Sequence, residues 1–179
     1  MLIRTLKPVL ERELALEKFS ARGVSGLVRR CISGKLIGAA EIYIPYRLYK
    51  ITVRDRIMSA VRFLAVDAAC GIFDPIEIGN APFDYHLIET RNFLPSEVAE
   101  TDTQAIVLSK ARTVLFSAGL FRLREPEISV ELVENDFHIG YWAGFYGSKK
   151  NMNIMVVDAM TRTIAGGKVT ECVKKWLNN

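Results

Sequence analysis

The stretch Glu41–Lys50, EIYIPYRLYK, decides the fold, because apolar side chains alternate along it with period two. Its even positions share one face of an extended chain and are apolar: Ile42, Ile44, Tyr46 and Leu48. This alternation predicts a β-strand with one buried face. Pro45 has no N–H for a sheet ladder, so we expect the strand to lie at an edge or to be bulged there.

A similar pattern returns in the second half of the chain. The residues at its odd positions are expected to be buried: Phe137, Ile139, Tyr141 and Ala143. Short sequences also recur in the same order, as Phe19-Ser20-Ala21 and Phe116-Ser117-Ala118, Ile44-Pro45-Tyr46 and Ile139-Gly140-Tyr141, and Val66-Asp67-Ala68 and Val157-Asp158-Ala159. Such internal similarity predicts a duplicated unit.

The remaining elements follow from helical and strand periodicity. Helices are predicted over 6–21, 24–32, 103–118 and 168–177, and further strands over 62–68, 72–78, 128–133 and 153–159. Asn135-Asp136 predicts a turn between two strands. We therefore predict an α+β fold, in which two duplicated units of a helix and an antiparallel sheet pack as one pseudo-symmetric body. Residues 1–83 form the first repeat, 84–102 the connection and 103–179 the second repeat.

The two Val-Asp-Ala sequences carry a family resemblance. Each ends a predicted strand, and they continue as Val66-Asp67-Ala68-Ala69-Cys70-Gly71 and Val157-Asp158-Ala159-Met160-Thr161-Arg162. They resemble the Val-Asp-Ala-x-Thr-Gly sequence of PepSY-like modules, and the helix-plus-sheet order is similar to PepSY-like and cystatin-like modules. Cys70 stands where that pattern has Thr, and Arg162 where it has Gly. The resemblance implies small, mostly non-catalytic modules in two tandem copies.

Composition limits the compartment and the classes of function. The chain has 179 residues, half of them hydrophobic, and a formal net charge of +4. No apolar stretch is long enough to span a membrane, and no export signal is evident, so we expect a cytoplasmic protein. The three cysteines, Cys31, Cys70 and Cys172, have no Cys-x-x-Cys spacing, and we expect them to be reduced. We predict neither a cofactor nor a metal.

The strand face opposite the predicted core suggests a binding surface. It carries polar-tipped aromatic residues together with Arg and His, a composition typical of interfaces. The candidate binding residues are Tyr43, Arg47, Tyr49, His138, Trp142 and Tyr146. The leading prediction is a non-enzymatic binding or interaction protein for a peptide, a protein or an apolar small molecule, with a homodimer as a further option. The strand beside Pro45 could also accept an added strand.

Two alternatives remain open at this point. A small hydrolase or isomerase would use Asp67, Asp158 or His138, because paired carboxylates and histidine perform acid–base chemistry. The structural alternative is that each Asp accepts backbone N–H groups in the turn that follows its strand. Binding to nucleic acid or an anionic membrane through the net positive charge would depend strongly on salt. The basic residues are dispersed, so no specific nucleic-acid surface is predicted.

Overall fold

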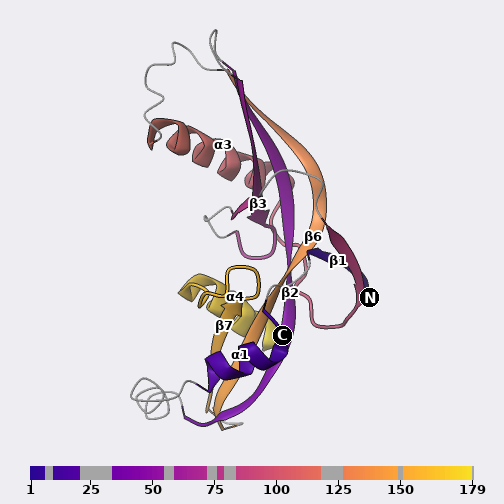
Figure 1. Ribbon diagram of the computed structural model, residues 1–179, viewed down its shortest axis with the longest axis vertical. Helices are drawn as coiled ribbons and strands as arrows, with labels where there is room; N and C mark the ends of the chain where they lie inside the picture. The colour runs from indigo at the N-terminus through magenta and orange to yellow at the C-terminus, as the bar shows by residue number, and fades with distance from the viewer. Residues whose placement is uncertain are drawn as a thin grey trace.

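A computed structural model describes residues 1–6, 10–20, 34–54, 59–71, 76–78, 84–117, 127–148 and 151–178. The helix predicted over 24–32 lies outside these residues, as does Cys31. The two longest elements are the strands β2 (Leu36–Arg54) and β6 (Glu127–Ser148). They pair antiparallel, with Ile44 opposite Ile139, and run along the length of the molecule (Figure 1). The strand predicted from Glu41–Lys50 is therefore confirmed, and it is longer than its central pattern.

Five shorter strands complete one continuous sheet. They are β1 (Leu2–Leu6), β3 (Ser59–Asp67), β4 (Ile76–Ile78), β5 (Tyr85–Glu89) and β7 (Asn151–Asp158). The order is β4-β3-β2-β6-β1-β5, with β7 also paired to β6, and β1 is parallel to β6 whereas the other pairs are antiparallel. The predicted pair of duplicated helix-plus-sheet units is wrong, because the described residues form a single mixed sheet. The N-terminal residues and the predicted connection both contribute strands to it.

Of the two alternatives predicted at Pro45, the edge is wrong, whereas a register irregularity lies next to it, between Tyr46 and Leu48. The Pro45 carbonyl accepts from the Ala68 N–H, so its missing N–H lies on the side where β3 has just ended. Beyond that point residues 92–94 take the place of β3, with hydrogen bonds from the Tyr43 N–H to the Asn92 carbonyl and from the Leu94 N–H to the Tyr43 carbonyl. The chain itself therefore occupies the position where an added strand was expected.

The described residues form three helices, α1 (Arg12–Phe19), α3 (Glu100–Ser117) and α4 (Gly167–Leu177). The predicted helix over 6–21 is shorter than expected, because Leu6 belongs to β1 and Leu10 and Glu11 are not helical. The helices predicted over 103–118 and 168–177 are confirmed by α3 and α4. None of the described helices has the length and apolar composition that crossing a membrane requires.

The predicted turn at Asn135-Asp136 is an irregularity inside β6. The strand continues through both residues, and Asp136 has a positive φ of 54°. On the opposite strand the register shifts between Tyr46 and Leu48. A turn-favouring pair at this position thus bends a long strand instead of ending it.

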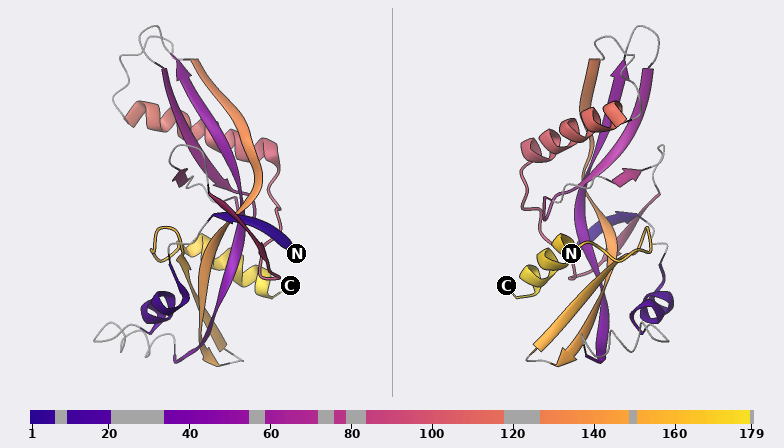
Figure 2. Two further views of the ribbon diagram at one scale, coloured as in Figure 1. Left: turned by 45° about the vertical axis from the view of Figure 1, so that its right-hand side comes forward. Right: turned by 90° about the vertical axis from the view of Figure 1, so that its left-hand side faces the viewer.

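Both faces of the central sheet are buried. The predicted core face is confirmed, and its members gather in one cluster with Val173 of α4: Ile42, Ile44, Tyr46, Leu48, Phe137, Ile139, Tyr141 and Ala143. On the opposite face, α1 covers the β6–β7 end and α3 covers the β2–β3 end. Figure 2 shows α1 and α4 on opposite sides of the same end of the sheet. A strand such as β2 is therefore buried on both sides from Ile42 to Tyr49.

Candidate functional site

The six predicted binding residues are all buried inside the chain. Their exposed fractions are 6% for Tyr43, 7% for Arg47, 1% for Tyr49, 7% for His138, 7% for Trp142 and 3% for Tyr146. The predicted binding surface required these side chains to be exposed, and the described residues bury all six. Three separate segments of the chain cover this face, and their backbone carbonyls accept hydrogen bonds from Arg47, Trp142 and Tyr146.

The start of α3 and the segment before it cover Arg47 and Tyr49. Arg47 donates from Nη1 to the Val98 carbonyl at 2.7 Å and from Nε to Oδ1 of Asn135 at 3.0 Å. The Tyr49 hydroxyl lies 2.6 Å from Oγ1 of Thr103. The guanidinium group therefore ties the bend of β6 to the entry of α3, which is a structural role.

Helix α1 and the residue Leu10 cover the other end of this face. The Trp142 indole N–H donates to the Leu10 carbonyl at 3.1 Å, and the Tyr146 hydroxyl donates to the Phe19 carbonyl at 2.9 Å. Each aromatic side chain thus satisfies a backbone carbonyl of the segment that buries it. Aromatic residues with a polar tip are common where a packed face needs such a hydrogen bond.

Tyr43 and His138 lie between these two ends. Residues 92–94 pair with Tyr43, and the rings of Phe93 and His138 meet edge to face with centroids 6.1 Å apart. The His138 Nδ1 atom is the single buried side-chain polar atom without a hydrogen-bond partner among the described residues. Burial is the main cause that lowers the pKa of His138, so the imidazole is held in its neutral form.

A cavity of about 320 Å³ lies on the opposite face of the sheet and brings Asp67 and Asp158 together. We call it the aspartate cavity. Its lining comes from the middle of β2 and β6, the ends of β3 and β7, the start of β4, the segment after β7 and the start of α4: Tyr46, Asp67, Ile76, Tyr141, Asp158, Thr161, Thr163, Ile164, Ala165, Gly166, Gly167, Lys168 and Val169. His138 does not line it. Two of the three residues predicted for an enzyme, Asp67 and Asp158, therefore line the same cavity. The third, His138, lies on the other face of the sheet.

The two aspartates hold equivalent turns. Oδ1 of Asp67 accepts from the backbone N–H groups of Ala69 and Cys70, at 2.7 and 3.0 Å. Oδ1 of Asp158 accepts from Met160 at 2.7 Å and from Thr161 at 3.2 Å. The structural alternative from the sequence is thus observed for one oxygen of each carboxylate.

A pair of tyrosine hydroxyls lies beside these carboxylates. The Tyr46 and Tyr141 oxygens are 2.6 Å apart, and both residues are buried. Burial raises the pKa of Tyr46 well above its usual value, and the neighbouring Tyr141 and Asp67 add to the effect. Burial, followed by Asp158, likewise raises the pKa of Tyr141. Both phenols therefore remain protonated hydrogen-bonding groups at any physiological pH.

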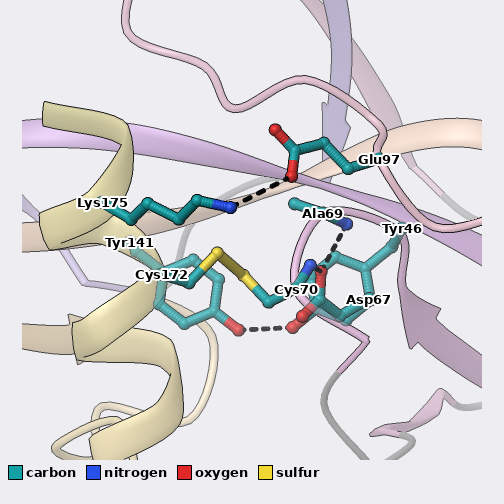
Figure 3. The surroundings of a disulfide bond; sticks show 8 residues. All are labelled: Tyr46, Asp67, Ala69, Cys70, Glu97, Tyr141, Cys172 and Lys175. Carbon is teal, nitrogen blue, oxygen red and sulfur yellow. Dashed lines mark hydrogen bonds and ion pairs between the residues drawn. A yellow bond between two sulfur atoms is a disulfide. The ribbon is translucent and has the colours of Figure 1, made fainter. Parts of the chain in front are cut away.

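A second cavity, of about 570 Å³, lies between α4, the turn at 69–71 and residues 94–97. We call it the disulfide cavity, because the bond between Cys70 and Cys172 forms part of its wall. The expectation of reduced cysteines is wrong for this pair. Figure 3 shows the disulfide beside the Tyr46–Tyr141 pair, with Lys175 extending past it towards Glu97. Lys168 lines both cavities.

From the sequence, Tyr46 and Tyr141 were predicted only as core residues, and Lys168 only as the start of the last helix. One signal could have identified the tyrosines. The tyrosines end the recurrent sequences Ile-Pro-Tyr and Ile-Gly-Tyr, and the aspartates lie in the two copies of Val-Asp-Ala. All four of these polar side chains line the aspartate cavity. No spacing in the sequence indicated that Lys168 would lie between two cavities.

Within the described part of the chain, no group of three or more His, Cys, Asp or Glu residues could hold a metal ion. No family model, curated protein or solved structure matches the chain. The resemblance to PepSY-like and cystatin-like modules stays a prediction. A function for this protein must therefore come from the chemistry of its own side chains.

Proposed function

We propose that this chain is a non-enzymatic binding protein whose aspartate cavity takes a small organic cation with an apolar body. The observation that carries the proposal is the meeting of two buried carboxylates and a tyrosine pair in one cavity with apolar walls. Ligand sites typically combine a mostly apolar lining with a few polar groups that fix orientation. The predicted binding function is kept, and its place moves from the aromatic face to this cavity.

Asp158 supplies the negative charge. Its side chain is only 8% exposed, and both of its hydrogen bonds to the following turn use Oδ1. The structure shows no partner for Oδ2 and no ion pair for this carboxylate among the residues that it describes. A buried carboxylate is costly unless a positive charge or hydrogen-bond donors accompany it. An ammonium group of a ligand would supply both.

The other walls define the rest of the ligand. Ile76, Ile164 and Val169 offer apolar surface, and Thr161 and Thr163 add hydroxyl groups that lie 2.8 Å from each other. The cavity volume of about 320 Å³ is at the lower end of the range for small-molecule sites. A primary amine on a single ring or a short branched chain suits these dimensions. A peptide, a protein or a second copy of the chain has no comparable support, because the aromatic face is covered.

Matched probes test the charge preference directly. Phenethylamine, 2-phenylethanol and phenylacetate have similar shapes and carry a positive, a zero and a negative charge. We expect calorimetric titration to show binding of the amine alone. If the alcohol or the carboxylate binds as tightly as the amine, or if none of the three binds at millimolar concentration, the proposal is contradicted.

Asp158→Asn separates binding from folding. The Asn side chain keeps an oxygen acceptor for the Met160 and Thr161 N–H groups, and it replaces the charged Oδ2 acceptor with a neutral NH2 donor. Amine affinity should fall by about tenfold or more, since hydrogen bonds to charged groups contribute about 1.5–3 kcal/mol. Asp84→Asn is the matched control, because that carboxylate is exposed and lies outside the cavity. Equal amine affinity in both variants would contradict the role of Asp158.

An enzyme remains the second candidate, and the shared cavity of Asp67 and Asp158 is the observation that favours it. Paired carboxylates can divide the roles of acid and base in hydrolysis or isomerisation. Turnover of ester, amide or sugar substrates that disappears in Asp158→Asn and persists in Asp84→Asn would favour this candidate. Binding of the amine without any turnover would favour the binding protein.

The cytoplasmic location predicted from the sequence is a separate question, which the disulfide bears on. Structural disulfides persist mainly in oxidising compartments, so the Cys70–Cys172 bond favours a compartment outside the reducing cytosol. Alkylation of free thiols in intact cells, followed by mass analysis of the chain, distinguishes the two locations. Free Cys70 and Cys172 would support the cytoplasm, and a persistent bond would oppose it.

A further inference from the structure

The disulfide lies in the wall of an open cavity, which sets it apart from a bond sealed in a core. Both cysteines are only partly buried, and both line the disulfide cavity of about 570 Å³. We propose that Cys70–Cys172 is a site of thiol–disulfide exchange with a low-molecular-weight thiol, which enters this cavity and bonds to the sulfur of Cys70. The proposal concerns a cavity and a chemistry other than those of the proposed cation site.

Access is the first requirement for exchange, because the attacking thiolate must approach a sulfur from outside. The cavity is bordered by Leu94 and Pro95 on one side and by Trp176 on the other. Its volume exceeds that of the aspartate cavity and accommodates a small thiol.

The charges around Cys172 set the direction of exchange. Lys168 precedes Cys172 by one helical turn and Lys175 follows it by three residues, so all three share one face of α4. Nearby cations lower the pKa of a thiol, and the more acidic thiol is the better leaving group. Cys172 is therefore the sulfur expected to leave, and Cys70 the sulfur expected to be attacked.

Two carboxylates oppose this effect. Glu97 lies 4.0 Å from Nζ of Lys175, and Glu171 is the helical neighbour of Cys172. For Lys168 the structure shows no ion pair among the described residues, so its charge remains available to the sulfur. We therefore infer that Lys168 is the cation that stabilises the Cys172 thiolate as it leaves.

The step is balanced in atoms and electrons. The entering thiolate forms a bond to the sulfur of Cys70, the Cys70–Cys172 bond breaks, and Cys172 departs with the electron pair as a thiolate that takes a proton from water. A second small thiol then attacks the mixed disulfide, which leaves two cysteine thiols and one oxidised small disulfide. Val173 remains fully buried next to Cys172, so the helix has a packing contact that does not depend on the bond.

The test uses the full chain with Cys31→Ser, so that only the disulfide cysteines remain. Folded protein is incubated with 2-mercaptoethanol, quenched with acid and alkylated, and adducts are located by peptide mass mapping. We expect one mercaptoethanol adduct per chain, on Cys70, with Cys172 alkylated. If Cys31→Ser does not fold, wild-type protein with Cys31 alkylated in advance replaces it.

Three outcomes overturn the proposal. Reaction only after unfolding in urea would show that the bond is inaccessible in the folded chain. An adduct mainly on Cys172 would reverse the assigned direction. Equal exchange rates in Lys168→Gln and Lys174→Gln would remove the role of Lys168, because Lys174 lies on α4 but outside the cavity lining. We expect Lys168→Gln to slow exchange about two- to fivefold, the size of an exposed charge interaction, and Lys174→Gln to leave the rate unchanged.

Discussion

The hydroxyl oxygens of Tyr46 and Tyr141 lie 2.6 Å apart in the buried centre of the sheet, although 95 residues separate them in the chain. The two strands that carry them cross this point antiparallel, so each tyrosine lies next to the aspartate turn at the end of a neighbouring strand. Both tyrosines belong to the core cluster and also line the aspartate cavity. Their hydroxyl groups are therefore part of the candidate site as well as of the packed core.

Removing both hydroxyls of this pair should cost less stability than the sum of the two single removals. Tyr46→Phe or Tyr141→Phe leaves its buried partner without a hydrogen bond, and we expect each to lose about 1–3 kcal/mol of unfolding free energy. The double variant should lose less than the sum, with a coupling energy of about 0.5–3 kcal/mol. Urea unfolding of all four proteins measures this cycle, and strictly additive losses would contradict the direct contact.

The inner face of the sheet could be predicted from the sequence, because period-two alternation survives in β2 and β6. The alternate residues expected on that face, between Ile42 and Leu48 and between Phe137 and Ala143, are all buried. The opposite face could not be predicted, because Arg47, Tyr49 and Trp142 have the polar groups of surface residues. Their polar tips are satisfied by α3 and Leu10, which are remote in sequence, and no local pattern reveals such partners.

The topology was missed for a related reason. Residues 2–6 and 85–89 are too short to show a period, and their strand character comes from pairing with each other and with β6. Local similarity between the halves suggested repeated units, whereas these pairings link the N-terminus, the middle and β6 in one sheet. The two aspartates were identified as a possible pair, and the tyrosines that complete their cavity were assigned to the core alone.

Loss of the disulfide should destabilise the chain without unfolding it. Cys70 and Cys172 are 102 residues apart, and a cross-link over a long loop restricts the unfolded ensemble. We expect the Cys70→Ala/Cys172→Ala variant to lose about 2–4 kcal/mol of unfolding free energy. Urea unfolding with and without reductant measures it. Reduced wild-type protein should match the variant, and equal stability of the oxidised and reduced forms would contradict the prediction.

The packing of α1 on β6 depends on the missing side chain of Gly144. A Cβ atom there would lie 2.7 Å from Cδ1 of Phe19, so the Phe19 ring or the helix that carries it must shift. We expect Gly144→Ala to lose about 1–3 kcal/mol, as overpacked cores do, and to shift the environment of Trp142. Gly38→Ala is the control, because a Cβ atom at that strand position meets nothing within 4 Å. Thermal unfolding measures the stability of both variants, and tryptophan fluorescence reports any change in the environment of Trp142.

Neutral His138 should make folding sensitive to acid. Burial holds its pKa in the folded chain below the value of about 6.5 expected after unfolding, although Asp136 and the Arg4 backbone oppose the shift. Between these two values the unfolded chain binds a proton that the folded chain does not. Stability is therefore full above pH 6.5 and falls as the pH drops through 6.5 towards the folded-state pKa.

His138→Gln removes this titration while keeping a polar side chain in place. Its unfolding free energy, measured in urea from pH 8 to pH 5, should fall less steeply than that of the wild type below pH 6.5. His86→Gln is the matched control, since the His86 side chain is 44% exposed at the surface beside Asp84. The control should follow the wild-type curve. If His138→Gln follows it as well, the buried imidazole is not the group that couples folding to acid.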